Sequence, residues 1–126
     1  MSIVNLVVEN LLLNDNGEYR SALSILSRKY SQIKIDRVAS RRCSKEVMKS
    51  CEIAIEAAIK ADELSKQKTA GLLNKILIKT LKIAQAALAI FLLKSPFKVG
   101  LAYNALHNVI KYLEHEEKKE KLKHIV

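Results

Sequence analysis

Residues 72–96, LLNKILIKTLKIAQAALAIFLLKSP, begin as an amphipathic helix and end as an almost uninterrupted apolar one. Lys75, Lys79 and Lys82 keep one side polar through the first three turns, and the same side then continues through Ala86 and Ala89. Because residues on one helix face recur every three to four positions, this spacing predicts a helix over 70–94. The second half of that helix has no polar side, so the pattern predicts that it is covered on more than one face.

Three environments could cover such a helix. A membrane span needs about 20 predominantly apolar residues, whereas the charge-free run over residues 83–93 has eleven and is flanked by lysines; we therefore do not expect a membrane partner. The helix could instead be the centre of a monomeric bundle, or face a neighbouring subunit on one side. We favour a homo-oligomer, because the alanines allow close helix approach and the N-terminal segment is also apolar. The predicted subunit-interface residues are Ile3, Val7, Leu11, Ala86, Ala89, Ile90 and Leu93.

The remainder of the chain also predicts helices. Three Gly and one Pro among 126 residues leave little material for tight turns, and the core is aliphatic because Trp is absent. Apolar spacing predicts helices over 18–34, 44–66 and 96–118, with Ser44, Thr69 and Ser95 as N-caps and Pro96 as a first helical residue. Residues 1–13 form an apolar arm or short helix, with a strand as the alternative, and 119–126 a charged, solvated tail. The expected fold is one all-α domain over 1–126, a helical bundle of four to five helices.

Positive charge is concentrated in one part of the chain. The formal net charge is +9, and all five arginines lie between Arg20 and Arg42. A clustered basic stretch is typical of phosphate-backbone binding, and the planar guanidinium suits phosphate better than an ammonium does. With few aromatic residues to stack on single-stranded bases, we expect double-stranded DNA rather than a single strand as the nucleic-acid partner. A basic surface that only maintains solubility is the alternative. The predicted nucleic-acid-binding residues are Arg28, Lys29, Lys34, Arg37, Arg41, Arg42, Lys45 and Lys49.

No catalytic, metal or cofactor signature is found in the sequence. The three histidines are separated by eight or nine residues and form no HExxH or ExxH pattern. Cys43 and Cys51 lie eight residues apart, about 12 Å along a helix, which exceeds the reach of a disulfide. We expect both to be small buried or half-buried side chains. The start of the chain lacks the basic segment of a secretory signal. The sequence therefore predicts a protein that is not an enzyme, has no cofactor and is not secreted.

The overall build resembles the small α-helical coat proteins of archaeal filamentous and spindle-shaped viruses. The resemblance is one of size, helix content, basic charge and Ile/Lys-rich, Trp-free composition across the chain, and involves no specific motif. It implies a structural, self-assembling protein of the virion, a capsid or nucleoprotein. Apolar helices would then pack between subunits while the Arg-rich segment neutralises the genome.

A second resemblance gives a different expectation. The segment over 95–114, SPFKVGLAYNALHNVIKYLE, loosely resembles the Gly-Leu-containing last helices of the small helical subunits of CRISPR effector complexes, through Gly100 and Leu101. That resemblance implies a cytoplasmic ribonucleoprotein subunit whose basic face holds a nucleic-acid backbone. Such a subunit would be nearly monomeric alone, whereas a coat protein would polymerise.

Overall fold

The computed structural model describes residues 2–13, 17–35, 42–66 and 73–125, with the side chains of residues 73–74 and 120–125 excepted. These residues form five helices and no strand, which confirms the all-α bundle. The helices are α1 (Ile3–Leu13), α2 (Glu18–Leu26), α3 (Lys45–Ser65), α4 (Leu73–Lys94) and α5 (Pro96–Ile125).

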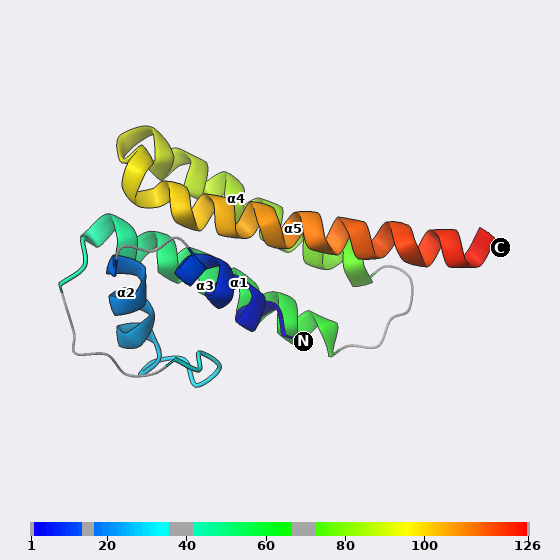
Figure 1. Ribbon diagram of the computed structural model, residues 1–126, viewed down its shortest axis with the longest axis horizontal. Helices are drawn as coiled ribbons and strands as arrows, with labels where there is room; N and C mark the ends of the chain where they lie inside the picture. Colours follow the sequence, from blue (N-terminus) through cyan, green and yellow to red (C-terminus); the bar gives the residue numbers. More distant parts are fainter. Residues whose placement is uncertain (1, 14–16, 36–41, 67–72, 126) are drawn as a thin grey trace.

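The two longest helices form a hairpin that lies along one side of the molecule. Helices α4 and α5 run side by side, and α3 packs against both of them. Helix α1 packs against α3 and α5, and the short α2 packs against α3 and α1 at one end (Figure 1). Helix α4 therefore has neighbours from its own chain on one side only, α3 and α5.

The predicted N-cap at Ser44 is confirmed, and α5 begins directly after Ser95, at Pro96, as predicted. The Ser44 hydroxyl accepts a hydrogen bond from the Val47 N–H at 3.3 Å, satisfying a donor that a helix start leaves unpaired. At the hairpin turn, the Ser95 N–H still donates to the Phe91 carbonyl, and the Val99 N–H donates to the Ser95 carbonyl. Pro96 begins α5 at the one position where its missing N–H costs no helical hydrogen bond. The predicted cap Thr69 and the expected helix start at 70–72 lie outside the described residues.

Helix α2 is shorter than the helix predicted over 18–34, because the chain leaves helical geometry after Leu26. The Ser27 hydroxyl donates to the Ser24 carbonyl at 2.6 Å, and the next amides bond three residues back in tight turns. These turns bring Ile33 into the core, where it is only 4% exposed. The periodic spacing was correct for burial but wrong for the helix end, since turns can also bury an apolar side chain.

Helix α5 is longer than the prediction of 96–118. It continues through the stretch expected to be a frayed tail and ends at Ile125. Its last turns extend past the other helices at one end of the molecule (Figure 1). Good helix formers, Glu, Lys and Leu, occupy residues 116–122, so intrinsic propensity favours helix there without an apolar face.

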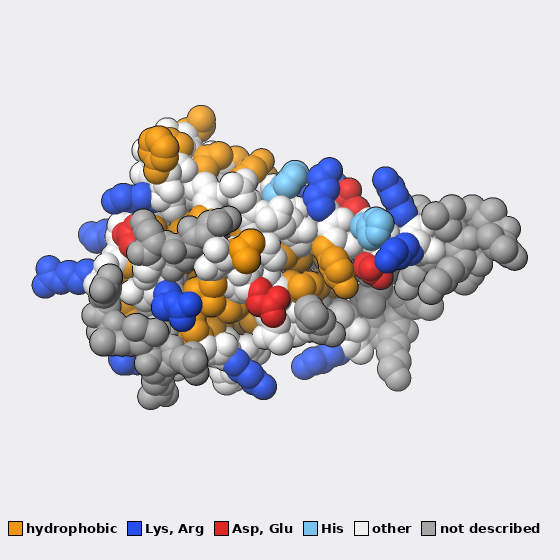
Figure 2. All heavy atoms as spheres, viewed as in Figure 1, with side chains coloured by type: hydrophobic (Ala, Val, Ile, Leu, Met, Phe, Trp, Pro, Cys, Tyr) orange, Lys and Arg blue, Asp and Glu red, His pale blue; other side chains and the backbone are white. Residues whose placement is uncertain are grey.

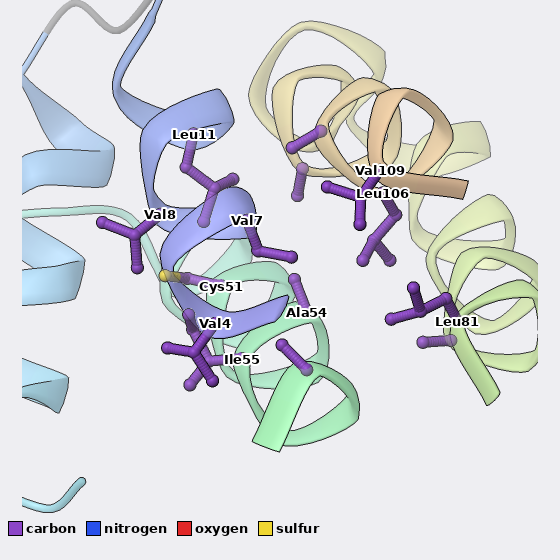
Figure 3. Packing of buried hydrophobic residues seen from close by; sticks show 14 of the residues in the cluster. Val4, Val7, Val8, Leu11, Cys51, Ala54, Ile55, Leu81, Leu106 and Val109 are labelled. Carbon is purple, nitrogen blue, oxygen red and sulfur yellow. The ribbon is translucent and has the colours of Figure 1, made fainter. Parts of the chain in front are cut away.

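The N-terminal segment is a helix, and its apolar face is buried within the chain itself. Ile3, Val7 and Leu11 are 5%, 0% and 0% exposed and form a core with Cys51 and Ile55 of α3 (Figure 3). The prediction that these three residues contact a neighbouring subunit is therefore replaced by a role in the core. The reason is the arrangement of α3 and α5, which together offer α1 a surface on which to bury its apolar stripe.

Two polar contacts position the shorter helices on this core. The Asp62 carboxylate of α3 accepts hydrogen bonds from the N–H groups of Ile3 and Val4 at 2.7 and 3.1 Å, capping α1 from a distant helix. The buried Tyr19 hydroxyl donates to the Lys98 carbonyl at 2.6 Å and lies 3.1 Å from the Ser50 hydroxyl. Helix α2 is thereby joined to α3 and to the start of α5.

Candidate nucleic-acid interface and exposed apolar face

The described members of the predicted basic set are all exposed to solvent. They come from three places: the turns after α2, the segment before α3, and the first turns of α3. Arg37 and Arg41 lie outside the described residues. The exposed residues are Arg28, Lys29, Lys34, Arg42, Lys45 and Lys49.

Half of this basic set gathers around one hollow at the start of α3. Arg42, Lys45 and Lys49 line the hollow together with Ile25 of α2 and Met48 of α3. The spacing of Lys45 and Lys49 places both on one side of the helix, since i and i+4 residues share a face. Lys and Arg side chains project from this end of the molecule (Figure 2). The arrangement could hold two or more backbone phosphates by charge, with no contact that reads a base.

Acidic residues bound this basic surface along α3. Glu52 lines the same hollow, and the Glu56 carboxylate accepts a hydrogen bond from the Tyr30 hydroxyl at 2.8 Å. That hydrogen bond raises the pKa of Tyr30 above its ordinary value. The outward stripe of α3 is therefore basic in its first turns and acidic one turn later.

Lys29 lies near the acidic residues Glu52 and Glu56. Its ammonium nitrogen lies 5.2 Å from the centroid of the Tyr30 ring, within the range of a cation–π contact. The interaction with Tyr30, supplemented by the carboxylates of Glu52 and Glu56, raises the pKa of Lys29. The structure thus gives Lys29 partners within the protein, whereas Lys45 and Lys49 extend from a helix start without such an aromatic contact among the described interactions.

The predicted interface residues of α4 remain exposed, in contrast with those of α1. Ile90 and Leu93 are 64% and 88% exposed, Ala86 is exposed and Ala89 half-buried. Sequence reasoning missed three further apolar residues on the same side, namely Ile76, Ile83 and Phe97, at 41%, 64% and 98% exposure. Apolar side chains gather over the α4–α5 turn in Figure 2. The signal that could have found the two isoleucines is their spacing on one helix, since Ile76, Ile83 and Ile90 are each seven residues apart. Phe97 lies past the turn, at the start of α5.

We call this side of α4 the outer seam. It consists of the residues that alternate at intervals of three and four along the exposed side of α4 and into α5. The outer seam is Ile76, Lys79, Ile83, Ala86, Ile90, Leu93 and Phe97.

A second basic group lies beside the outer seam, next to acidic residues of α5. Lys75, Lys79 and Lys82 line a groove with Glu114 and Glu117, and the Lys82 ammonium lies 3.5 Å from the Glu114 carboxylate. The sequence showed five lysines over 75–98 without one acid. The fold supplies an acid from α5, so Lys82 of this group is paired with Glu114. The sequence did not indicate this ion pair, because Lys82 and Glu114 are 32 residues apart.

Helix α4 can be compared with a membrane-spanning helix by its length and composition only. Among the described residues, Lys75–Lys94 is the single helix long and apolar enough to cross a membrane, with a mean hydropathy of 1.9 and 28% of its apolar window buried. The core helix of a water-soluble protein can pass the same test. The expectation that no membrane is involved stays a prediction.

The remaining polar groups offer no assembled chemical site among the described residues. No cluster of three or more His, Cys, Asp or Glu there could hold a metal ion. Cys51 is fully buried and Cys43 half-buried. Burial raises the pKa of the Cys43 thiol above its ordinary value, which lowers its thiolate fraction and its reactivity.

Comparisons with protein-family models, with curated proteins and with solved structures found no match to this chain.

Proposed function

We propose that this chain is a structural, self-assembling protein that packages nucleic acid, as a viral coat protein or nucleoprotein does. The observation that carries the proposal is the outer seam: a stripe, apolar except for Lys79, that stays exposed on α4, whereas the apolar stripe of α1 is buried in the core. A contiguous apolar face of this kind marks an interaction site in a folded protein.

The basic hollow supports the nucleic-acid part of the proposal. Arg42, Lys45 and Lys49 share no residue with the outer seam, so one chain could hold a neighbour and a phosphate backbone at the same time. Because these are charge contacts without aromatic stacking, binding would be insensitive to sequence and steeply dependent on salt. Double-stranded DNA is the proposed ligand.

Light scattering over a salt series, with and without a random-sequence DNA duplex, tests both parts. We expect assemblies or protein–DNA filaments that dissociate as salt rises. A chain that stays monomeric and binds no duplex contradicts the proposal. A stable monomer that does bind duplex or RNA in a salt-dependent way favours the alternative, a small helical subunit of a ribonucleoprotein such as a CRISPR effector complex. Its outer seam would then contact a different protein.

The charge at the hollow gives a sharper test of nucleic-acid binding. In the double variant Lys45→Gln/Lys49→Gln, two phosphate contacts are removed, and the slope of log Kd against log salt should fall by about 2. The matched control is Lys60→Gln/Lys66→Gln, which removes the same charge from two exposed positions, one near the end of α3 and one directly after it. Equal effects of the two double variants would show that the protein binds through its net charge alone.

Lys29 should contribute less to duplex binding than Lys45, because the neighbours that raise the pKa of Lys29 also interact with its charge. Its contact with Tyr30 and the nearby Glu52 and Glu56 already balances part of its charge. We expect Lys29→Gln to weaken duplex binding less than Lys45→Gln does, measured by fluorescence anisotropy at fixed salt. A larger loss from Lys29→Gln would place the DNA on the α2 side of the hollow instead.

A further inference from the structure

Helix α4 carries two apolar stripes on different sides. Leu77, Leu81 and Leu88 point into the bundle and are at most 4% exposed, because α3 and α5 cover that side. The outer seam is left uncovered, and its exposure rises from 41% at Ile76 to 98% at Phe97. The largest uncovered side chains are therefore near the α4–α5 turn.

The outer seam has the spacing of a helix that packs on another helix. Along α4, Ile76, Ile83 and Ile90 recur every seven residues, and each is followed three residues later by Lys79, Ala86 and Leu93 in turn. Phe97 lies past the α4–α5 turn, at the start of α5. The alternation along α4 is the heptad arrangement in which side chains of one helix fit between those of a facing helix. A lipid-facing or solvent-facing stripe has no need of such regular spacing.

The size of the outer seam suits a contact between two copies. At on the order of 100 Å² of apolar surface for each large side chain, its five large residues present about 500 Å². That is near the upper end of what a monomer exposes, and with flanking residues it approaches the roughly 800 Å² per partner of a stable interface.

The order of residues along α4 also suits a copy of itself. In a two-fold contact the same stripe of both copies faces itself, with the chain direction reversed in one copy. Large side chains of one copy must therefore lie opposite small side chains of the other. Small Ala86 lies next to large Ile90 near the middle of the stripe, and Ile83 and Leu93 lie at similar distances on either side. Reversal therefore places large residues opposite small ones at the centre.

The distribution of charge selects the direction of the second helix. Lys75, Lys79 and Lys82 lie in the first half of α4, and the second half is free of charge until Lys94. A parallel pair would set the three lysines beside those of the partner, where like charges repel. An antiparallel pair sets them beside the uncharged half of the partner's α4, where the lysine stems can pack along apolar side chains.

We infer that the outer seam is the contact of an antiparallel, two-fold pair of α4 helices from two copies of this chain, with Ala86 facing the partner's Ile90 and Ile83 facing the partner's Leu93. This inference rests on the self-assembly in the proposed function and names the surface through which it begins.

Sedimentation velocity on the purified chain at high salt tests the surface. Ile90→Glu should raise the Kd of the pair by roughly 100-fold or more, because a carboxylate would be buried in an apolar contact. The matched control is Leu13→Glu, which places the same charge on a large apolar residue that is 74% exposed at the end of α1, away from the outer seam. Circular dichroism verifies that both variants remain helical. Equal Kd values for the two variants would overturn the inference.

Disulfide trapping tests the direction, in a Cys43→Ser background, with Cys51 left in place because it is fully buried. An Ile83→Cys chain mixed with a Leu93→Cys chain should form the mixed dimer, whereas each alone should not. In the antiparallel pair two copies of either cysteine lie about 15 Å apart along the axis, beyond disulfide reach. Efficient self-linking by each variant alone would show a parallel pair and overturn the inference.

The outcomes separate this inference from the proposed function. If Ile90→Glu chains still form the assemblies of the parent chain, the pair is wrong and assembly uses another surface. If the parent chain is monomeric at every concentration and salt, both fail. If the parent chain fails to pair but binds neutral phosphatidylcholine vesicles and Ile90→Glu does not, the outer seam faces lipid and the inference is overturned.

Discussion

At the scale of single residues, Tyr19 shows how a few polar groups determine where helices lie. Its hydroxyl is buried between α2, α3 and α5 and donates to the Lys98 carbonyl. In Tyr19→Phe that carbonyl and the Ser50 hydroxyl lose a partner, and we expect a loss of about 1–2 kcal/mol in the free energy of unfolding, measured by urea denaturation. Tyr112→Phe is the control, since Tyr112 is 47% exposed and its change should be near zero.

Cys43 provides a residue-scale prediction about pH. Burial raises the pKa of its thiol, so at any pH below that pKa the folded chain holds less thiolate than a free cysteine does. Alkylation of Cys43 by iodoacetamide should therefore be slower than that of a model thiol at pH 8 and should accelerate at higher pH. Mass spectrometry of the intact chain measures the rates. Modification at the model rate under native conditions would contradict the structure around Cys43.

At the scale of helices, α1 depends on a cap supplied from 58 and 59 residues away. The two hydrogen bonds from Ile3 and Val4 to Asp62 satisfy donors that the first turn of α1 cannot pair internally. We expect Asp62→Ala to cost about 1 kcal/mol and to increase hydrogen exchange in α1 before the other helices. The neighbouring Glu63→Ala is the control, because Glu63 is exposed. Equal effects at both positions would show that α1 is held by apolar packing alone.

At the scale of the whole molecule, one side of α4 belongs to the core of the fold and another side forms the proposed contact between copies. Leu88 is fully buried in the core and Ile90 is 64% exposed, two residues along the same helix. Leu88→Ala should lower the free energy of unfolding by about 2–5 kcal/mol, through lost burial and the cavity left behind. Its Tm should still rise with protein concentration, because binding a second copy stabilises the folded state.

Ile90→Ala should give the reverse pattern. Little core packing is lost, and the dependence of Tm on protein concentration should weaken or vanish. Thermal unfolding followed by circular dichroism at several protein concentrations measures both effects. A concentration dependence unchanged in Ile90→Ala would contradict the proposed role of the outer seam.

The sequence by itself determined the helical class of this protein and most of its core. The apolar spacing that predicts helices over 44–66 and 96–118 includes Val47, Cys51 and Ile55 of α3 and Leu106 and Ile110 of α5, and the structure buries all five. The caps at Ser44 and Ser95 were equally predictable. Both signals are local, since helical periodicity and capping depend on residues within one turn.

Only the tertiary structure decided which apolar stripes remain uncovered. Residues of α1 and α4 looked equally suited to a subunit contact, but α3 and α5 bury Val7 and Leu11 and leave Ile90 and Leu93 exposed. It also placed Glu114 beside Lys82 and Asp62 at the start of α1. These outcomes depend on which helices meet in space, and one helix's periodicity shows that a face is apolar without showing what covers it.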